Sequence, residues 1–106
     1  MEEQETQPEI YVGDKPLGAY VKAVRYRVND IGEAKIVARG NNIRKAVDTA
    51  EIVKRESSEE LENYDAADIS ISDINTLTER GENEDESTFI ISKIIIDVEG
   101  NVEFSE

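Results

Sequence analysis

The chain has 106 residues, 25 of them acidic and 12 basic, for a formal net charge of −13, and it contains neither cysteine nor histidine. This length suits one small domain with a modest core. Without cysteine and histidine, the sequence excludes disulfides, thiolate metal sites, most zinc chemistry and the common nucleophile–base pairs. No apolar run approaches the length of a membrane span and no signal peptide opens the chain, so we expect a cytoplasmic protein with no membrane partner.

Charge is distributed unevenly along the chain. Residues 1–9 hold four acids and no base, residues 10–56 hold ten bases and six acids, and residues 57–106 hold two bases and fifteen acids. This asymmetry is more informative than the net charge. An acidic proteome, as in a salt-adapted organism, explains the excess of acid and does not exclude a basic binding surface in the first half.

The first half of the chain predicts a strand, a helix and a second strand. Residues 1–9 are polar and acidic, which predicts a disordered tail, and a short strand follows at 10–12. Pro16 suits the first turn of a helix, whose apolar residues recur at helical spacing until the helix ends within 29–32. A short central strand is predicted at 34–38.

The stretch ARGNNIRKAVDTAEIV, which starts at Ala38, predicts a strand end, a glycine turn and an amphipathic helix. Gly40 allows a sharp exit from the sheet because glycine takes a positive φ without steric cost. Asn41 or Asn42 can cap the helix, which we expect to run to about Arg55. Its apolar face is formed by Ile43, Ala46, Val47, Ala50 and Val53.

The acidic segment 56–67 either extends this helix or forms a loop, and we favour the loop. A strand is predicted at 69–77, with a bulge near Ser72 and Asp73 where the alternation of apolar residues breaks. The polar segment 78–88 is predicted to be a loop with Gly81 as its turn residue.

Residues 89–98 predict a long strand with apolar side chains on both faces. Both faces should therefore be covered, one by the helices and the other by a second subunit in a homodimer. Residues 100–106 are expected to form a C-terminal tail. The resulting β-α-β-α-β-β order implies an α+β two-layer sandwich, in which two helices cover one face of a four-stranded mixed sheet.

Basic and amide side chains gather around the glycine turn and the start of the second helix. Exposed backbone N–H groups at a helix N-terminus, together with such side chains, suit the binding of phosphate oxygens. A solvated helix start that happens to be basic is the alternative interpretation.

Two motifs carry a resemblance to a known family. ARGNNIRKAVDTAEIVKR resembles the signature of the Alba family of archaeal chromatin and RNA-binding proteins, and YVGDKPLGAYVKAV resembles that family's opening strand, lysine-bearing loop and first helix. Their spacing also matches the family, closely over 10–55 and loosely over 69–98. The resemblance implies an Alba-like domain at 10–99 that binds DNA or RNA and is associated with the chromosome.

The resemblance also implies a phosphate-binding surface, formed by Lys15, Arg39, Asn41, Arg44 and Lys45. The family usually has two lysines in the first loop, whereas here Asp14 takes the place of one, which leaves Lys15 as the candidate for acetylation. Asn41 stands where the family often has arginine, and Arg44 stands where a small polar residue is common. Asp48 and Glu51 are interpreted as structural, in an ion pair at a buried edge or in a cap.

Other positions depart from the family pattern. The segment 78–88 matches hairpin arms that normally carry basic residues to the minor groove, but it has five acids against Arg80. It therefore points away from nucleic acid, binds through cations at high salt, or no longer binds. The acids lack the ligand spacing of a calcium loop, so no metal is expected. Ser57 replaces an aromatic residue that some Alba proteins use between dimers, which argues against a higher assembly.

The leading hypothesis is a non-catalytic protein that packages DNA or binds RNA as a homodimer, without cofactor, metal or small-molecule substrate. Binding would be largely independent of sequence because phosphate contacts carry no base code. The alternative is an interaction module that has kept the fold, lost nucleic-acid binding, and uses its acidic surface to bind a basic protein partner.

Overall fold

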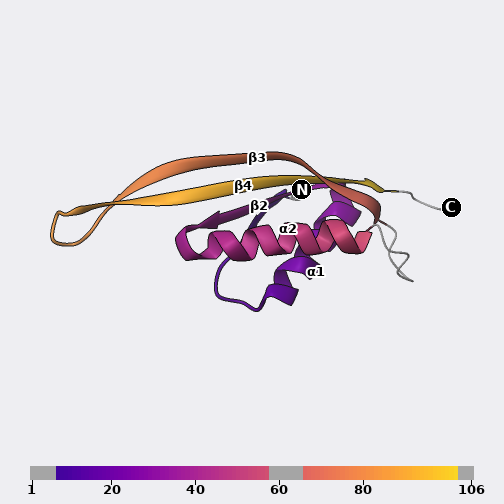
Figure 1. The fold of residues 1–106 in the computed structure, drawn as a ribbon, viewed down its shortest axis with the longest axis horizontal. Helices are drawn as coiled ribbons and strands as arrows, with labels where there is room; N and C mark the ends of the chain where they lie inside the picture. Colours follow the sequence, from indigo (N-terminus) through magenta and orange to yellow (C-terminus); the bar gives the residue numbers. More distant parts are fainter. Residues whose placement is uncertain (1–6, 58–65, 103–106) are drawn as a thin grey trace, which may run out of the picture.

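The computed structural model describes residues 7–57 and 66–102 (Figure 1). The elements are β1 (Glu9–Tyr11), α1 (Leu17–Ile31), β2 (Glu33–Arg39), the 3₁₀ turn η1 (Gly40–Asn42), α2 (Ile43–Ser57), β3 (Ala66–Glu82) and β4 (Thr88–Val102). Within these ranges the strands form one sheet in the order β1-β2-β4-β3, with β1 parallel to β2 and the other pairs antiparallel. Both helices lie on one side of this sheet, which confirms the predicted two-layer α+β sandwich.

The core lies between the helices and the central strands β2 and β4. Side chains that face the helices are apolar and directly paired across these strands, as in Ile36 with Ile96 and Ala34 with Val98. Both helices bury one stripe at helical spacing, which is why the apolar periodicity located them correctly. Their buried residues are Tyr20, Val21, Val24 and Val28 in α1, and Ala46, Thr49, Ala50 and Val53 in α2.

Two glycines with positive φ end the elements that lead into the site. Gly32, at φ 84°, caps α1 and donates its N–H to the carbonyl of Val28 at 2.8 Å. Gly40, at φ 56°, separates β2 from α2, as the sequence predicted. An L residue is strained in this region of φ/ψ space, so both turns depend on glycine.

The β3–β4 hairpin is longer than the sequence predicted. The predicted loop at 78–88 is wrong, because β3 continues to Glu82, β4 begins at Thr88, and only 83–87 form the turn. Gly81 is therefore a strand residue paired with Phe89, and a Cβ on Gly81 would lie 2.2 Å from Cζ of that ring. The polar segment reads as a loop because neither of its faces is buried, so it lacks apolar alternation.

Beyond Arg39, where β2 ends, only β3 and β4 continue side by side; we call this part the hairpin arm, Thr78–Glu82 with Thr88–Ser92. Figure 1 shows the arm reaching well past the start of α2. Nearer the helices, the pairing of β3 with β4 shifts register between Ile71 and Asp73, which confirms the predicted bulge.

Other boundaries differ in smaller ways. The predicted acidic loop at 56–67 is shorter, because α2 includes Glu56 and Ser57 and β3 begins at Ala66. Its remaining part, 58–65, lies outside the described residues. β4 continues through Gly100, where the sequence predicted a tail, because this glycine lies against the helix layer. A Cβ on Gly100 would lie 2.7 Å from Cγ1 of Val28.

The face of the sheet away from the helices, called the outer face here, carries alternate residues of each strand. Lys35, opposite Asp97, forms an ion pair with it at 3.1 Å, and its hydrogen bond to the Asp97 carboxylate raises the pKa of Lys35. Val37 lies opposite Ile95, which is partly buried. The cover of this face by a second subunit stays a prediction.

Candidate functional site

Two side chains hold the loop between β1 and α1, one as a hydrogen-bond acceptor and the other as a donor. The Tyr20 hydroxyl oxygen accepts the backbone N–H groups of Gly13 at 2.8 Å and Lys15 at 3.0 Å. Lys45 Nζ donates to the carbonyl oxygens of the same two residues, at 2.8 and 2.9 Å. Four backbone groups of a short loop are thereby satisfied, which fixes the path of the loop.

The same two side chains also contact each other. Lys45 Nζ lies 5.7 Å from the centroid of the Tyr20 ring, within the range of a cation–π interaction. Tyr20 comes from the first half of α1, where its ring is buried, and Lys45 comes from the first turn of α2. Lys45 therefore ties the α2 N-terminus to the loop that carries the exposed side chain of Lys15.

Arg39 occupies the last position of β2, on the outer face. Its Nε donates to Glu79 Oε1 at 2.5 Å, and its Nη2 donates to Oε2 at 3.4 Å. Lys93 Nζ lies 3.5 Å from the same Oε2. The hydrogen bond to Glu79 raises the pKa of Arg39, and that same bond lowers the pKa of Glu79 from its ordinary value of 4.5.

Asn41 and Arg44 face solvent, as Lys15 does. Asn41 is exposed in η1, and the Arg44 side chain is 93% exposed, with its Nε 3.9 Å from Asp48 Oδ2 one turn further along α2. Glu51 likewise pairs with Lys54, at 2.9 Å. Asp48 and Glu51 thus make the predicted ion pairs, but the predicted buried edge is wrong, because both carboxylates lie on the exposed surface of α2.

The structure therefore groups the five predicted residues around two neighbouring features. Lys15 and Lys45 meet at the first loop, while Arg39, Asn41 and Arg44 follow one another from the end of β2 into α2. Sequence reasoning missed Tyr20, Glu79 and Lys93. Their roles depend on helix packing and strand register, for which the sequence offers no local signal.

The acidic turn of the hairpin forms its own set of hydrogen bonds at the end of the arm. Asp85 Oδ1 accepts the N–H of Ser87 at 3.1 Å and its hydroxyl at 2.5 Å, and the bond from this hydroxyl is the main reason that the pKa of Asp85 lies below 3.8. Glu86 turns the chain with φ 71°. Within 7–57 and 66–102, no group of three or more acidic side chains is arranged to hold a metal ion.

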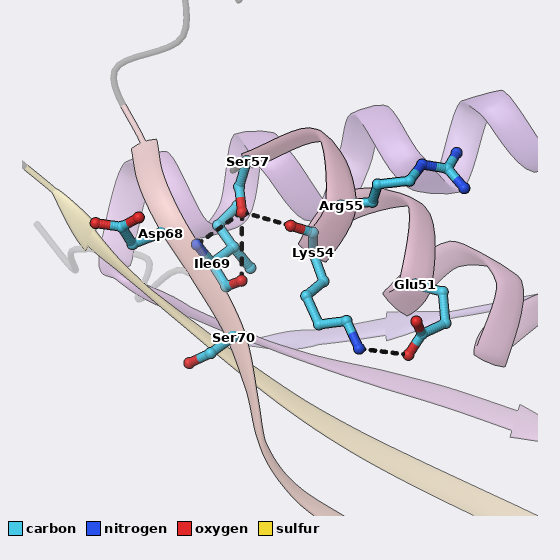
Figure 2. Close-up of a pocket in the computed structure, with 7 residues that line it drawn as sticks. All are labelled: Glu51, Lys54, Arg55, Ser57, Asp68, Ile69 and Ser70. Carbon is cyan, nitrogen blue, oxygen red and sulfur yellow. Dashed lines mark hydrogen bonds and ion pairs between the residues drawn. The ribbon is translucent and has the colours of Figure 1, made fainter. Parts of the chain in front are cut away.

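An open hollow of about 540 Å³ lies at the other end of α2 (Figure 2). Ser57 dominates its geometry: its hydroxyl accepts the N–H of Ile69 and donates to the carbonyl of Lys54, both at 2.9 Å. Ser57 thus fastens the last turn of α2 to β3, a different use of this position from the aromatic contact between dimers.

The Glu79 ion pairs lead to a testable pH dependence. A carboxyl group whose folded-state pKa is depressed stabilises the fold above its unfolded pKa, and this contribution disappears as the pH falls through the folded pKa. We therefore expect Glu79→Gln to melt at a lower temperature than the parent protein at neutral pH. The difference should vanish well below pH 4.5, as measured by thermal circular dichroism. A difference of constant size across this range would show that the ion pairs do not contribute.

No helix among the described residues is long and apolar enough to cross a membrane.

Comparison with known proteins identifies the fold and both motifs. A family model described as Alba matches residues 8–78. The DNA/RNA-binding protein Alba of Nitrosopumilus maritimus is 37% identical over 97 residues, which cover 92% of this chain and 95% of that protein.

Further relatives agree in sequence and in structure. The DNA/RNA-binding protein Alba 1 of Archaeoglobus fulgidus is 41% identical over 73 residues, or 68% of this chain and 79% of that protein. The solved structure of Alba from Thermoplasma volcanium matches with a TM-score of 0.68 and 33% identity, covering 86% of this chain and 98% of that one. The two archaeal sequence relatives are named as DNA/RNA-binding proteins, and the family model spans both motifs. The chain therefore belongs to the Alba family.

Proposed function

We propose that this chain is a non-catalytic nucleic-acid-binding protein, which binds double-stranded DNA, RNA or both mainly through phosphates. The observation that carries the proposal is the link made by Lys45, which joins the loop of Lys15 to the basic N-terminal turn of α2. One surface thereby presents an ammonium group, the Arg44 guanidinium and the Asn41 amide to solvent. The DNA/RNA-binding names of the archaeal relatives support this assignment.

The proposed residues have different tasks on this surface. Lys15, Arg39 and Arg44 supply positive charge to phosphates, and Asn41 supplies a hydrogen-bond donor. Lys45 acts mainly by positioning the loop, because two of its three N–H groups already bind carbonyl oxygens. Such contacts fix the position of a protein on nucleic acid without reading bases, which fits a role in chromosome packaging or RNA binding in the cytoplasm.

Binding of duplex DNA and of duplex RNA, measured by electrophoretic shift over a range of salt concentrations, tests the proposal. We expect weak affinity that falls steeply with salt, since phosphate contacts release counterions. No shift with either duplex at low salt would contradict the proposal. The acidic hairpin turn would then favour the alternative of a module that binds a basic protein, which a basic peptide titrated under the same conditions would detect.

We further propose that the protein acts as a homodimer, which doubles the basic surface across a two-fold axis. Large apolar side chains remain exposed on α2 and on the helix side of the sheet: Val47 of α2 at 40%, Ile74 of β3 at 54% and Ile90 of β4 at 68%. The outer face, by contrast, already pairs its charges within the subunit, as Lys35 does with Asp97. The outer face also exposes Leu77 at 41% and Phe89 at 42%, but it carries these ion pairs among them. We therefore place the interface on the helix side, where the exposed fractions of Ile74 and Ile90 are larger.

Substitution of these residues tests the dimer. We expect light scattering to show a dimer at micromolar concentration and Ile74→Asp to convert it to a folded monomer, because an unpaired charge buried at an interface costs several kcal/mol. In the monomer Ile74 is exposed, so the subunit itself should remain folded. If Ile95→Asp dissociates the dimer and Ile74→Asp does not, the interface lies on the outer face; a monomeric parent protein would remove the dimer altogether.

A further inference from the structure

Charged side chains from three strands meet on the outer face, where β2 ends and the hairpin arm begins. Arg39 of β2 and Lys93 of β4 are direct partners in the antiparallel register, so their side chains leave the same face of the sheet. Glu79 of β3 reaches both of them, with one carboxylate oxygen 2.5 Å from Arg39 Nε and the other 3.5 Å from Lys93 Nζ.

The two cations have a geometry that suits an anion. Arg39 offers its Nε and Nη2 as a fork to both oxygens of the carboxylate, and Lys93 adds a point charge on one side. Arginine forks and lysine ammonium groups bind phosphate in this same manner. Carboxylate and phosphate oxygens would use the same donors, so the two anions compete for the site.

Two of the three side chains remain substantially exposed, and the third, Lys93, is exposed only in part. Arg39 is 42% exposed, Glu79 is 34% exposed and Lys93 is 17% exposed. Leu77, opposite Lys93 on β3, is 41% exposed on this face. An ion pair as exposed as that of Arg39 with Glu79 is worth little, and a ligand can displace it without unfolding the sheet.

We infer that Arg39 and Lys93 form one anion-binding site, that Glu79 occupies it in the free protein, and that a nucleic-acid phosphate binds there by displacing Glu79. This inference rests on the proposed nucleic-acid binding and extends it. Lys93 becomes a further phosphate ligand, and Glu79 becomes a residue that sets the affinity. The carboxylate that most directly opposes binding then lies within β3, rather than in the acidic turn at the end of the arm.

Removing the charge of Glu79 without changing its shape is the direct test. Glu79→Gln should tighten binding of duplex DNA and RNA about fivefold per site, the upper value of a partly exposed ion pair. The matched control is Glu99→Gln, which makes the same charge change on the same face of β4 but lies about 20 Å from Lys93 at the usual rise per residue. At physiological salt the screening length is about 8 Å, so this control should change affinity less than twofold.

A second substitution identifies the cation that Glu79 blocks. Lys93→Met should have little effect in the parent protein, where Glu79 must still be displaced, but it should remove most of the gain in the Glu79→Gln background. Thermal unfolding of each variant provides a further check. Glu79→Gln should melt at a lower temperature while it binds more tightly, so improved folding cannot account for the gain.

The outcomes separate this inference from the proposed function. If the parent protein binds and Glu79→Gln binds no better than Glu99→Gln, the inference is overturned while nucleic-acid binding stands. If the parent protein fails to bind and Glu79→Gln binds, the inference is supported and Glu79 acts as a block. Failure of every variant to bind either duplex overturns both.

Discussion

Replacing Lys15 and Arg39 together by glutamate is expected to weaken binding of duplex DNA and RNA at least a hundredfold. Each charge-assisted hydrogen bond to phosphate contributes about 1.5–3 kcal/mol, so two lost contacts amount to roughly 3–6 kcal/mol in each subunit. Weak nonspecific affinity totals only about 5–8 kcal/mol, so little measurable binding should remain. Both side chains lie at the surface, and circular dichroism should show that the domain stays folded.

The salt dependence of nucleic-acid binding is an independent test of the same variant. Each phosphate contact contributes about 0.9 to the slope of log affinity against log salt, so the loss of two contacts should flatten the slope by about two per subunit. Charge reversal at Lys22 and Arg27 on α1 is the matched control, with an identical change in net charge. If this control weakens binding equally, diffuse electrostatic attraction accounts for the affinity and the proposed surface is wrong.

Removing the ammonium group of Lys45 should weaken binding roughly tenfold or more, although Lys45 itself makes few contacts with phosphate in this proposal. Lys45→Met leaves the carbonyls of Gly13 and Lys15 without their donor, so the loop loses its fixed path. Lys15 would then have to be ordered at the moment of binding, at a cost of about 1–2 kcal/mol for each residue whose backbone is fixed.

A double-mutant cycle distinguishes positioning from direct contact. If Lys45 acts through Lys15, then Lys45→Met should cost little once Lys15→Met is already present. If both residues grip separate phosphates, the two losses in binding free energy should add. Tyr20→Phe is a useful third variant, because it removes the oxygen that accepts the N–H groups of the same loop while it keeps the ring beneath Lys45.

The elements that the sequence located well are those with a buried stripe. α1 and α2 each repeat apolar residues at helical spacing, and Gly40 marks the exit from β2 because only glycine takes its φ without strain. The β3 half of the hairpin arm escaped prediction for the opposite reason, whereas the strand predicted at 89–98 includes most of its β4 half. Glu79 and Arg80 lie in a part of β3 where neither face of the sheet is buried in the core, so their side chains carry no hydrophobic pattern.

The sequence names the candidate residues of the site but not the contacts that they make in the fold. Lys15, Arg39, Asn41, Arg44 and Lys45 were identified from their places next to turns and helix starts. Arg39 and Lys93 share the Glu79 carboxylate because of the β2–β4 register. This register is set by contacts between residues more than fifty positions apart. The use of Lys45 as a clamp for a loop thirty residues earlier depends on the packing of the two helices.

The hairpin arm has a consequence for the dynamics of the protein. Past Arg39 it is a two-stranded ribbon, and such ribbons are only marginally stable in water without a covering layer. Its amide protons should therefore exchange with solvent through local openings that leave the β2–β4 centre closed. Glu79 lies within this ribbon, so each such opening of the arm would release Arg39 from Glu79. The anion site would therefore be free to bind a ligand whenever the two strands of the arm separate locally.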